Sequence, residues 1–230
     1  TVGSFGSPLL IKDFFMAAGD TQVSIANQAL LLLGADTIAS FSNGTAVGNA
    51  LDIIYPKVKT TTLGMYPWTF TLKKAELSRL STAPTAHFLY QYSLPPDMIN
   101  SVPRSVYNSS DRGAATITDW QIQGETLLTD NTQIFVDYQQ DIIEAKLPVY
   151  FTQLLVYMLA WNLAETITDQ TEKGAYYKNI ALGGAADNNR GGYFRTAINL
   201  DGAGETPPVI AQYLLTEVRG CLLYTSDAAD

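Results

Sequence analysis

Residues 147–168 read LPVYFTQLLVYMLAWNLAETIT, the longest strongly apolar stretch of the chain. Its large aliphatic residues recur every four positions, which is the spacing of one face of an α-helix. The members of this row are Leu155, Leu159, Leu163 and Ile167. Pro148 suits the first turn of a helix, because the amide hydrogen that proline lacks has no partner there. We therefore predict a helix over 147–168 with a wide buried face.

The same stretch does not suit a lipid bilayer. Its strongly apolar part, about 147–163, is shorter than the roughly 20 residues that span a membrane. It also contains the polar side chains of Gln153 and Asn162. No basic flank precedes an apolar segment near the N-terminus, as it would in a secretory signal. We expect a soluble protein with no membrane partner.

Three further helices are predicted, at residues 21–33, 45–65 and 170–189. Apolar residues cover most of the first helix, so it should be largely buried, with Asp20 as its N-cap and Gly34 at its end. Pro56 lies inside the second helix and should kink it. Because each helix carries more apolar surface than it can hide alone, we expect the helices to pack together.

The middle of the chain changes from helical to alternating periodicity. Short strands are predicted near residues 68–72, 88–92, 99–107, 120–124, 126–129 and 133–138. Gly124 and Glu125 separate two of them and predict a tight hairpin. The fold class that follows is α+β: a helical bundle formed by the N- and C-terminal helices, with an inserted, mostly antiparallel β-sheet domain. The bundle is assigned to residues 16–66 and 147–195, and the β domain to residues 67–146.

Both ends of the sequence differ in character from the rest. Residues 1–15 precede Met16, which opens a convincing start, so we interpret them as a non-native extension. Residues 221–230, CLLYTSDAAD, hold the only cysteine and resemble a translated sequencing adapter. Residues 196–220 are predicted to form an extended tail whose apolar end docks on another protein. The docking residues are Val209, Ile210, Tyr213, Leu214 and Leu215.

Composition disfavours tight nucleic-acid binding and most catalytic chemistry. The formal net charge is −8 and no run of Lys and Arg is present, so tight DNA binding is not expected. A single histidine, His87, cannot form a two-histidine metal site, and no Gly-x-Ser-x-Gly motif accompanies it. We interpret His87 as a residue at a sheet edge. The sequence therefore predicts no enzyme and no cofactor.

Two groups of residues leave other functions open. Asp137, Asp141 and Glu144 precede the 147–168 helix and could form an acid/base pair or a calcium site, although acids there are commonly solvated or face the helix dipole. An alternative function is a virion-associated cell-wall hydrolase that uses acids such as Asp97 or Asp137. A second group is aromatic and could stack sugars, although core packing is the favoured interpretation. Its members are Trp68, Phe70, Tyr90, Tyr92 and Trp120. A carbohydrate-binding module would require Trp68 and Trp120 to be exposed.

An ordered set of short motifs resembles the tail tubular protein A, or head-to-tail adaptor, family of short-tailed bacteriophages. The set contains YPWTF at 66–70, YQYSLPPD at 90–97, WQIQG at 120–124, VDY at 136–138 and an LAxxLA pattern at 159–164. We call nine of these positions the signature residues: Trp68, Phe70, Tyr92, Leu94, Pro95, Asp97, Trp120, Gly124 and Tyr138. Thr71 departs from the family pattern, in which alanine is commoner.

The resemblance implies a structural role in the virion. Members of this family form a homo-oligomeric ring of about twelve copies, closed by heterologous contacts between neighbours. The ring joins the portal protein to the tail nozzle protein at the head-tail junction, and the DNA passes through its channel without specific binding. The subunit would be assembled in the host cytoplasm. A head- or tail-completion protein with a related helical core is the main structural alternative.

Overall fold

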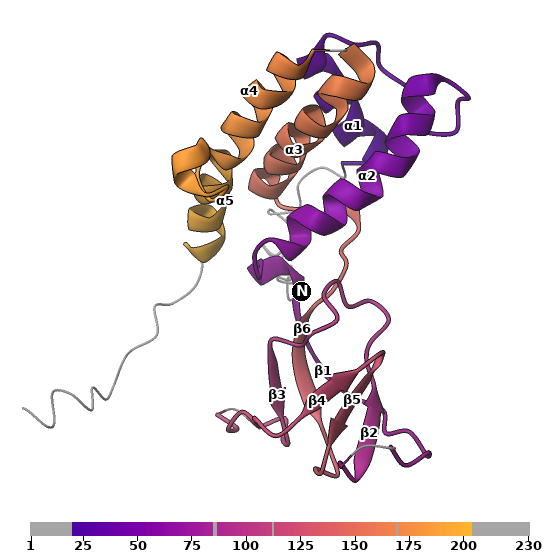
Figure 1. Cartoon of the computed structure of the whole chain (residues 1–230), viewed down its shortest axis with the longest axis vertical. Helices are drawn as coiled ribbons and strands as arrows, with labels where there is room; N and C mark the ends of the chain where they lie inside the picture. Colours follow the sequence, from indigo (N-terminus) through magenta and orange to yellow (C-terminus); the bar gives the residue numbers. More distant parts are fainter. Residues whose placement is uncertain (1–19, 85–86, 112, 169, 204–230) are drawn as a thin grey trace, which may run out of the picture.

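The computed structural model describes residues 20–84, 87–111, 113–168 and 170–203. These residues form a mixed α+β fold of five helices and two three-stranded antiparallel sheets (Figure 1). Helices from both ends of the chain lie together, and the strands from the middle of the chain lie beyond them (Figure 1). We call these two regions the helical part and the β part.

Helix α3 (Val149–Thr168) lies at the centre of the helical part. It contacts the four other helices: α1 (Gln22–Leu33), α2 (Ala46–Gly64), α4 (Thr171–Leu182) and α5 (Gly192–Gly202). The leucine row explains this position, because Leu155, Leu159 and Leu163 are fully buried. Each such side chain contributes about 2 kcal/mol through burial. The predicted helix over 147–168 is confirmed, and no helix in the described part of the chain is long and apolar enough to cross a membrane.

The first two helices begin at threonine caps. The Thr21 hydroxyl accepts a hydrogen bond from the Ser24 amide at 3.1 Å, so the prediction of Asp20 as the N-cap is wrong. The Asp20 carboxylate instead accepts from the Ser24 hydroxyl. Thr45 caps α2 in the same way, through the Gly48 amide. Pro56 lies inside α2, as predicted.

The C-terminal helical region differs from the prediction. Helix α4 ends at Leu182, not near residue 189, because Gly183 adopts a positive φ of 82°. After the short 3-10 turn Ala185–Asp187, the chain forms α5, so residues 196–202 are helical and not an extended tail. A Cβ at Gly192 would meet the Ile180 carbonyl oxygen at 2.5 Å, so this close return of the chain requires glycine. The docking residues predicted at 209–215, and both suspect ends, lie outside the described residues.

The β part contains two sheets that enclose a second core. Strands β1 (Leu72–Glu76), β6 (Phe135–Gln139) and β3 (Ser105–Tyr107) form one sheet in the order β1-β6-β3. Strands β2 (Tyr90–Ser93), β5 (Thr126–Thr129) and β4 (Gln121–Gln123) form the other in the order β2-β5-β4. The buried residues of this core are Leu77, Tyr92, Val106, Leu127, Ile134, Val136 and Tyr138. Gly124, at φ 62°, forms the predicted hairpin between β4 and β5.

The strand predicted at 68–72 is wrong except at its last residue, and the strand predicted at 99–107 is shorter than expected. Residues 69–71 form a 3-10 turn, and β1 begins only at Leu72. The reason is tertiary: Trp68 is buried in the helical core, while the Thr69 amide is held by a carboxylate from α5. Within the predicted strand 99–107, only residues 105–107 pair with a neighbouring strand.

Candidate functional site

The chain passes between the helical and β parts twice, at residues 66–72 and 138–147, and we call this region the junction. Trp68 is fully buried there, with the rings of Phe151 and Phe194 packed edge-on against it at centroid distances of 5.2 and 6.0 Å. Its indole nitrogen donates a hydrogen bond to the Thr62 carbonyl at 3.2 Å. Phe70 stacks beside it. Because Trp68 is buried, it cannot stack on a sugar in solution.

A buried carboxylate on α5 ties the C-terminal helix to this junction. The Asp201 side chain accepts hydrogen bonds from the Thr69 amide at 2.9 Å, the Thr69 hydroxyl at 2.8 Å and the Tyr150 hydroxyl at 2.6 Å. Burial, and then the hydrogen bond and charge of Asp201, raises the pKa of Tyr150 above its ordinary value. Asp201 was missed by sequence reasoning, because its partners are distant in the chain and its helix was predicted as extended.

Gln139 closes the junction from the side of the β part. Its side-chain amide lies near three acceptors, the carbonyls of Leu63 and Tyr66 and the Thr71 hydroxyl, at 2.8–3.3 Å. Its oxygen accepts from the Asn100 side chain at 3.1 Å. The last residue of β6 therefore holds the end of α2 and the start of β1 together.

Two further signature residues meet beside the junction. Asp97 accepts a hydrogen bond from the Tyr138 hydroxyl at 2.9 Å and pairs with the Lys73 ammonium at 3.1 Å. Desolvation opposes ionisation of Asp97, but the hydrogen bonds from Lys73 and Tyr138 together hold its pKa below the ordinary value. The Asp97 carboxylate thus joins Lys73, 24 positions before it, to Tyr138, 41 positions after it.

The remaining signature residues build the β part. Tyr92 is buried and its hydroxyl donates to the Asn131 carbonyl at 2.7 Å, while the half-buried Trp120 donates to the Ile117 carbonyl at 3.0 Å. Residues Leu94, Pro95 and Gly124 line one open cavity of about 470 Å³ next to the β4–β5 hairpin. Burial of Tyr92 agrees with core packing of the aromatic residues rather than sugar stacking.

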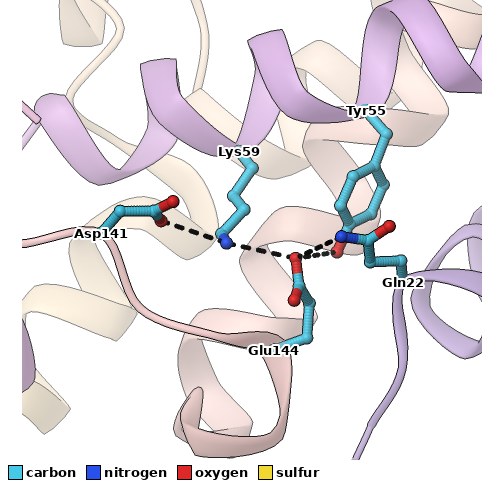
Figure 2. Close-up of polar contacts among 5 residues, drawn as sticks. All are labelled: Gln22, Tyr55, Lys59, Asp141 and Glu144. Atoms are coloured by element: carbon cyan, nitrogen blue, oxygen red, sulfur yellow. Dashed lines mark hydrogen bonds and ion pairs between the residues drawn. The ribbon is translucent and has the colours of Figure 1, made fainter. Parts of the chain in front are cut away.

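The three acids before α3 do not act as a group. Figure 2 shows that Asp141 and Glu144 both point toward Lys59 of α2, each with an oxygen 3.1 Å from its ammonium. Glu144 also accepts hydrogen bonds from the Tyr55 hydroxyl at 3.4 Å and the Gln22 side chain at 3.3 Å (Figure 2). Burial, and then the charge of and hydrogen bond to Glu144, raises the pKa of Tyr55. Asp141 and Glu144 therefore both form ion pairs with Lys59.

Asp137 lies elsewhere, on β6 opposite Lys74 of β1. Among the described residues, no group of three or more His, Cys, Asp or Glu side chains is placed to hold a metal ion, so the predicted acidic grouping does not form a calcium site. The described His87 is exposed in the segment before β2.

Apolar side chains are exposed on several helices. Ile53 on α2 is 74% exposed, Leu31 on α1 is 65% exposed and Tyr176 on α4 is 61% exposed. Helices α1 and α4 are joined locally, because the Tyr177 hydroxyl and the Lys173 ammonium donate to carbonyls at the end of α1.

A scan against protein-family models finds no match to this sequence. A search of curated proteins likewise finds no relative.

Proposed function

We propose that this chain is the subunit of a ring-forming head-to-tail adaptor of a short-tailed bacteriophage. In this role it is a structural virion protein that joins the portal to the tail nozzle around the DNA channel. The observation that carries the proposal is the place of the signature residues: Trp68, Phe70, Asp97 and Tyr138 lie at or beside the junction between the helical and β parts.

An adaptor must hold its head-facing and tail-facing surfaces at a constant angle while DNA passes. We interpret the helical part as a bundle that faces the portal, and the β part as an insertion that contributes the tail-side contacts. The junction would serve this purpose, because buried rings and fully bonded polar groups resist bending more than a solvated linker does. The hydrogen bonds of Asp201 and Gln139 supply such groups.

A closed ring needs two different surfaces on each subunit that fit one another. Helices α2 and α4 both pack on α3 and lie on opposite sides of it in Figure 1. We propose that the surface around Ile53 on α2 meets the surface around Leu31 and Tyr176 of the neighbouring copy. These side chains are exposed in the single chain, and burying them between copies would favour association.

The test is the mass of the purified chain, alone and with a portal ring, by light scattering and negative-stain microscopy. We expect closed rings near twelve copies, formed alone or on the portal, and smaller species for Ile53→Asp. The control is Leu89→Asp, which adds the same charge at a residue that is 65% exposed but lies outside the helices. A monomeric wild-type chain that does not bind the portal would refute the adaptor.

The apolar segment 209–215 gives a separate test. We propose that it docks on a neighbouring subunit or on the portal, since five of its residues carry large apolar side chains. Deleting residues 206–220 should therefore reduce ring formation or portal binding. Full rings and unchanged portal binding by the deleted chain would contradict this part of the proposal.

A further inference from the structure

We propose that the outer face of the β1-β6-β3 sheet holds a binding site for a phosphate group, centred on Lys74 and Arg104. An open cavity of about 420 Å³ lies on this face. Three of its seven lining residues are cationic, although the chain as a whole is acidic. Lys73 lies opposite the buried Tyr138 and directs its ammonium to Asp97, so Lys74 and Arg104 are the cations of this site. The lining residues are Leu72, Lys73, Lys74, Arg104, Ser105, Tyr107 and Asp137.

Strand register brings these residues together from distant parts of the chain. Asp137 of β6 lies opposite Lys74 of β1 on one side and opposite Ser105 of β3 on the other. Successive side chains of a strand point to opposite faces, and Val136 and Tyr138 are buried in the core of the β part. Lys74, Asp137 and Ser105 therefore share the outer face. Arg104, just before β3, also lines the cavity, and its backbone amide donates to the Asp137 carbonyl at 2.8 Å.

Two of the three cations are not engaged by a carboxylate. Three ion pairs occur within residues 20–84, 87–111, 113–168 and 170–203, and none includes Lys74 or Arg104. The third cation, Lys73, pairs with Asp97. The Lys74 ammonium lies 4.2 Å from the centroid of the Tyr107 ring, a contact that holds it over the sheet. The Asp137 carboxylate opposes an anion here and limits the affinity.

The chemistry of the lining favours phosphate. A guanidinium binds two phosphate oxygens side by side, an ammonium adds a point charge, and a serine hydroxyl can donate a third hydrogen bond. The cavity falls within the roughly 300–1,000 Å³ of small-molecule sites, and is larger than a lone phosphate ion needs. The phosphate is thus expected on a larger molecule, either a nucleotide or a DNA backbone. The site lies on a single chain and does not rest on ring formation.

The experiment is a titration of the full-length chain at constant ionic strength, followed by amide chemical shifts. The three probes are inorganic phosphate, adenosine monophosphate and a short DNA duplex. We expect shifts at residues 73–74 and 104–107, and a loss of affinity of about fivefold or more for Arg104→Gln. The matched control is Lys178→Gln, which removes a lysine that also lies over an aromatic ring, Trp161, but in the helical part.

A second variant tests the same site in the opposite direction. Asp137→Asn removes the opposing charge and should strengthen binding by about threefold or more, whereas Glu125→Gln, at an exposed acid outside the cavity lining, should not. Tighter binding of the mononucleotide than of the duplex would identify a nucleotide as the source of the phosphate, and the reverse would identify DNA. No shifts with any probe, or equal effects of Arg104→Gln and Lys178→Gln, would overturn the proposal.

Discussion

Replacing Lys59 by methionine should leave the buried Glu144 carboxylate without its cationic partner. The Lys59 side chain is 10% exposed and lies 3.1 Å from Glu144, which is 12% exposed, and 3.1 Å from Asp141, which is 63% exposed. Methionine keeps the unbranched stem of lysine, so the packing of this side chain from α2 is largely preserved and the lost charge dominates the effect.

The magnitude follows from these exposures. Removing one partner of a buried ion pair costs about 3–5 kcal/mol of the free energy of unfolding. Tyr55 and Gln22 still donate hydrogen bonds to Glu144 in the variant, so we expect a value near the lower end, about 3 kcal/mol. Asp141→Asn should cost less than about 1 kcal/mol, because water already solvates that carboxylate. Adding Glu144→Gln to Lys59→Met should recover about 2 kcal/mol.

The assay is urea unfolding followed by circular dichroism, with the four chains of the Lys59/Glu144 double-mutant cycle and the Asp141→Asn variant measured at the same pH. Equal slopes against urea would show that the variants differ in stability and not in the extent of unfolding. The reasoning fails if Asp141→Asn destabilises as much as Lys59→Met, or if the double variant is no more stable than Lys59→Met alone.

Three further predictions follow from buried and hydrogen-bonded groups. Trp68→Ala should cost about 3–5 kcal/mol of unfolding free energy and the half-buried Trp120→Ala clearly less, as measured by urea unfolding; equal costs would contradict the assignment of Trp68 to the core. The pKa of Tyr150 is raised above its ordinary value of 10.0, so the stability that it contributes with Asp201 is complete below pH 10 and is lost as the pH rises beyond it. Tyr150→Phe should therefore reduce the dependence of unfolding on pH in alkaline solution, and an unchanged dependence would contradict this. The pKa of Asp97 is lowered below 3.8, so its contribution to the free energy of unfolding is present above that pH and is lost in stronger acid. Asp97→Asn should reduce this acid dependence by less than about 1 kcal/mol, because the pair with Lys73 is partly exposed. A larger effect in acid titrations of stability would contradict this.

Sequence reasoning succeeded where one segment carries its own pattern. The leucine row of α3 predicts a buried helical face, because burial of that face needs only the spacing of residues within the helix. Gly124 predicts a hairpin for a similar reason, since its positive φ is a local backbone requirement. Most strands in the middle of the chain followed from the same local periods, but the alternation at 68–72 predicted a strand where residues 69–71 form a 3-10 turn.

The same reasoning failed at α5. Residues 192–202 begin and end with glycine, but Phe194, Ala197 and Ile198 have the spacing of one helical face, a pattern that the neighbouring glycines obscured. The helix forms because Phe194 and Ala197 are buried against its neighbours and Asp201 accepts three hydrogen bonds at the junction. The helical spacing and these tertiary contacts together outweigh the glycines at both ends of the segment.

Sequence alone determined the α+β class, the central helix and the absence of any basic run, because these depend on composition and on spacing within a segment. Only the tertiary structure decided that Asp201 accepts a hydrogen bond from Thr69, 132 residues away, and that Lys59 pairs with two acids. The same holds for Lys74 and Arg104, which line one cavity. Such pairings depend on strand register and on how helices pack. A one-residue change of register would place Lys74 on the other face of the sheet without altering any local pattern.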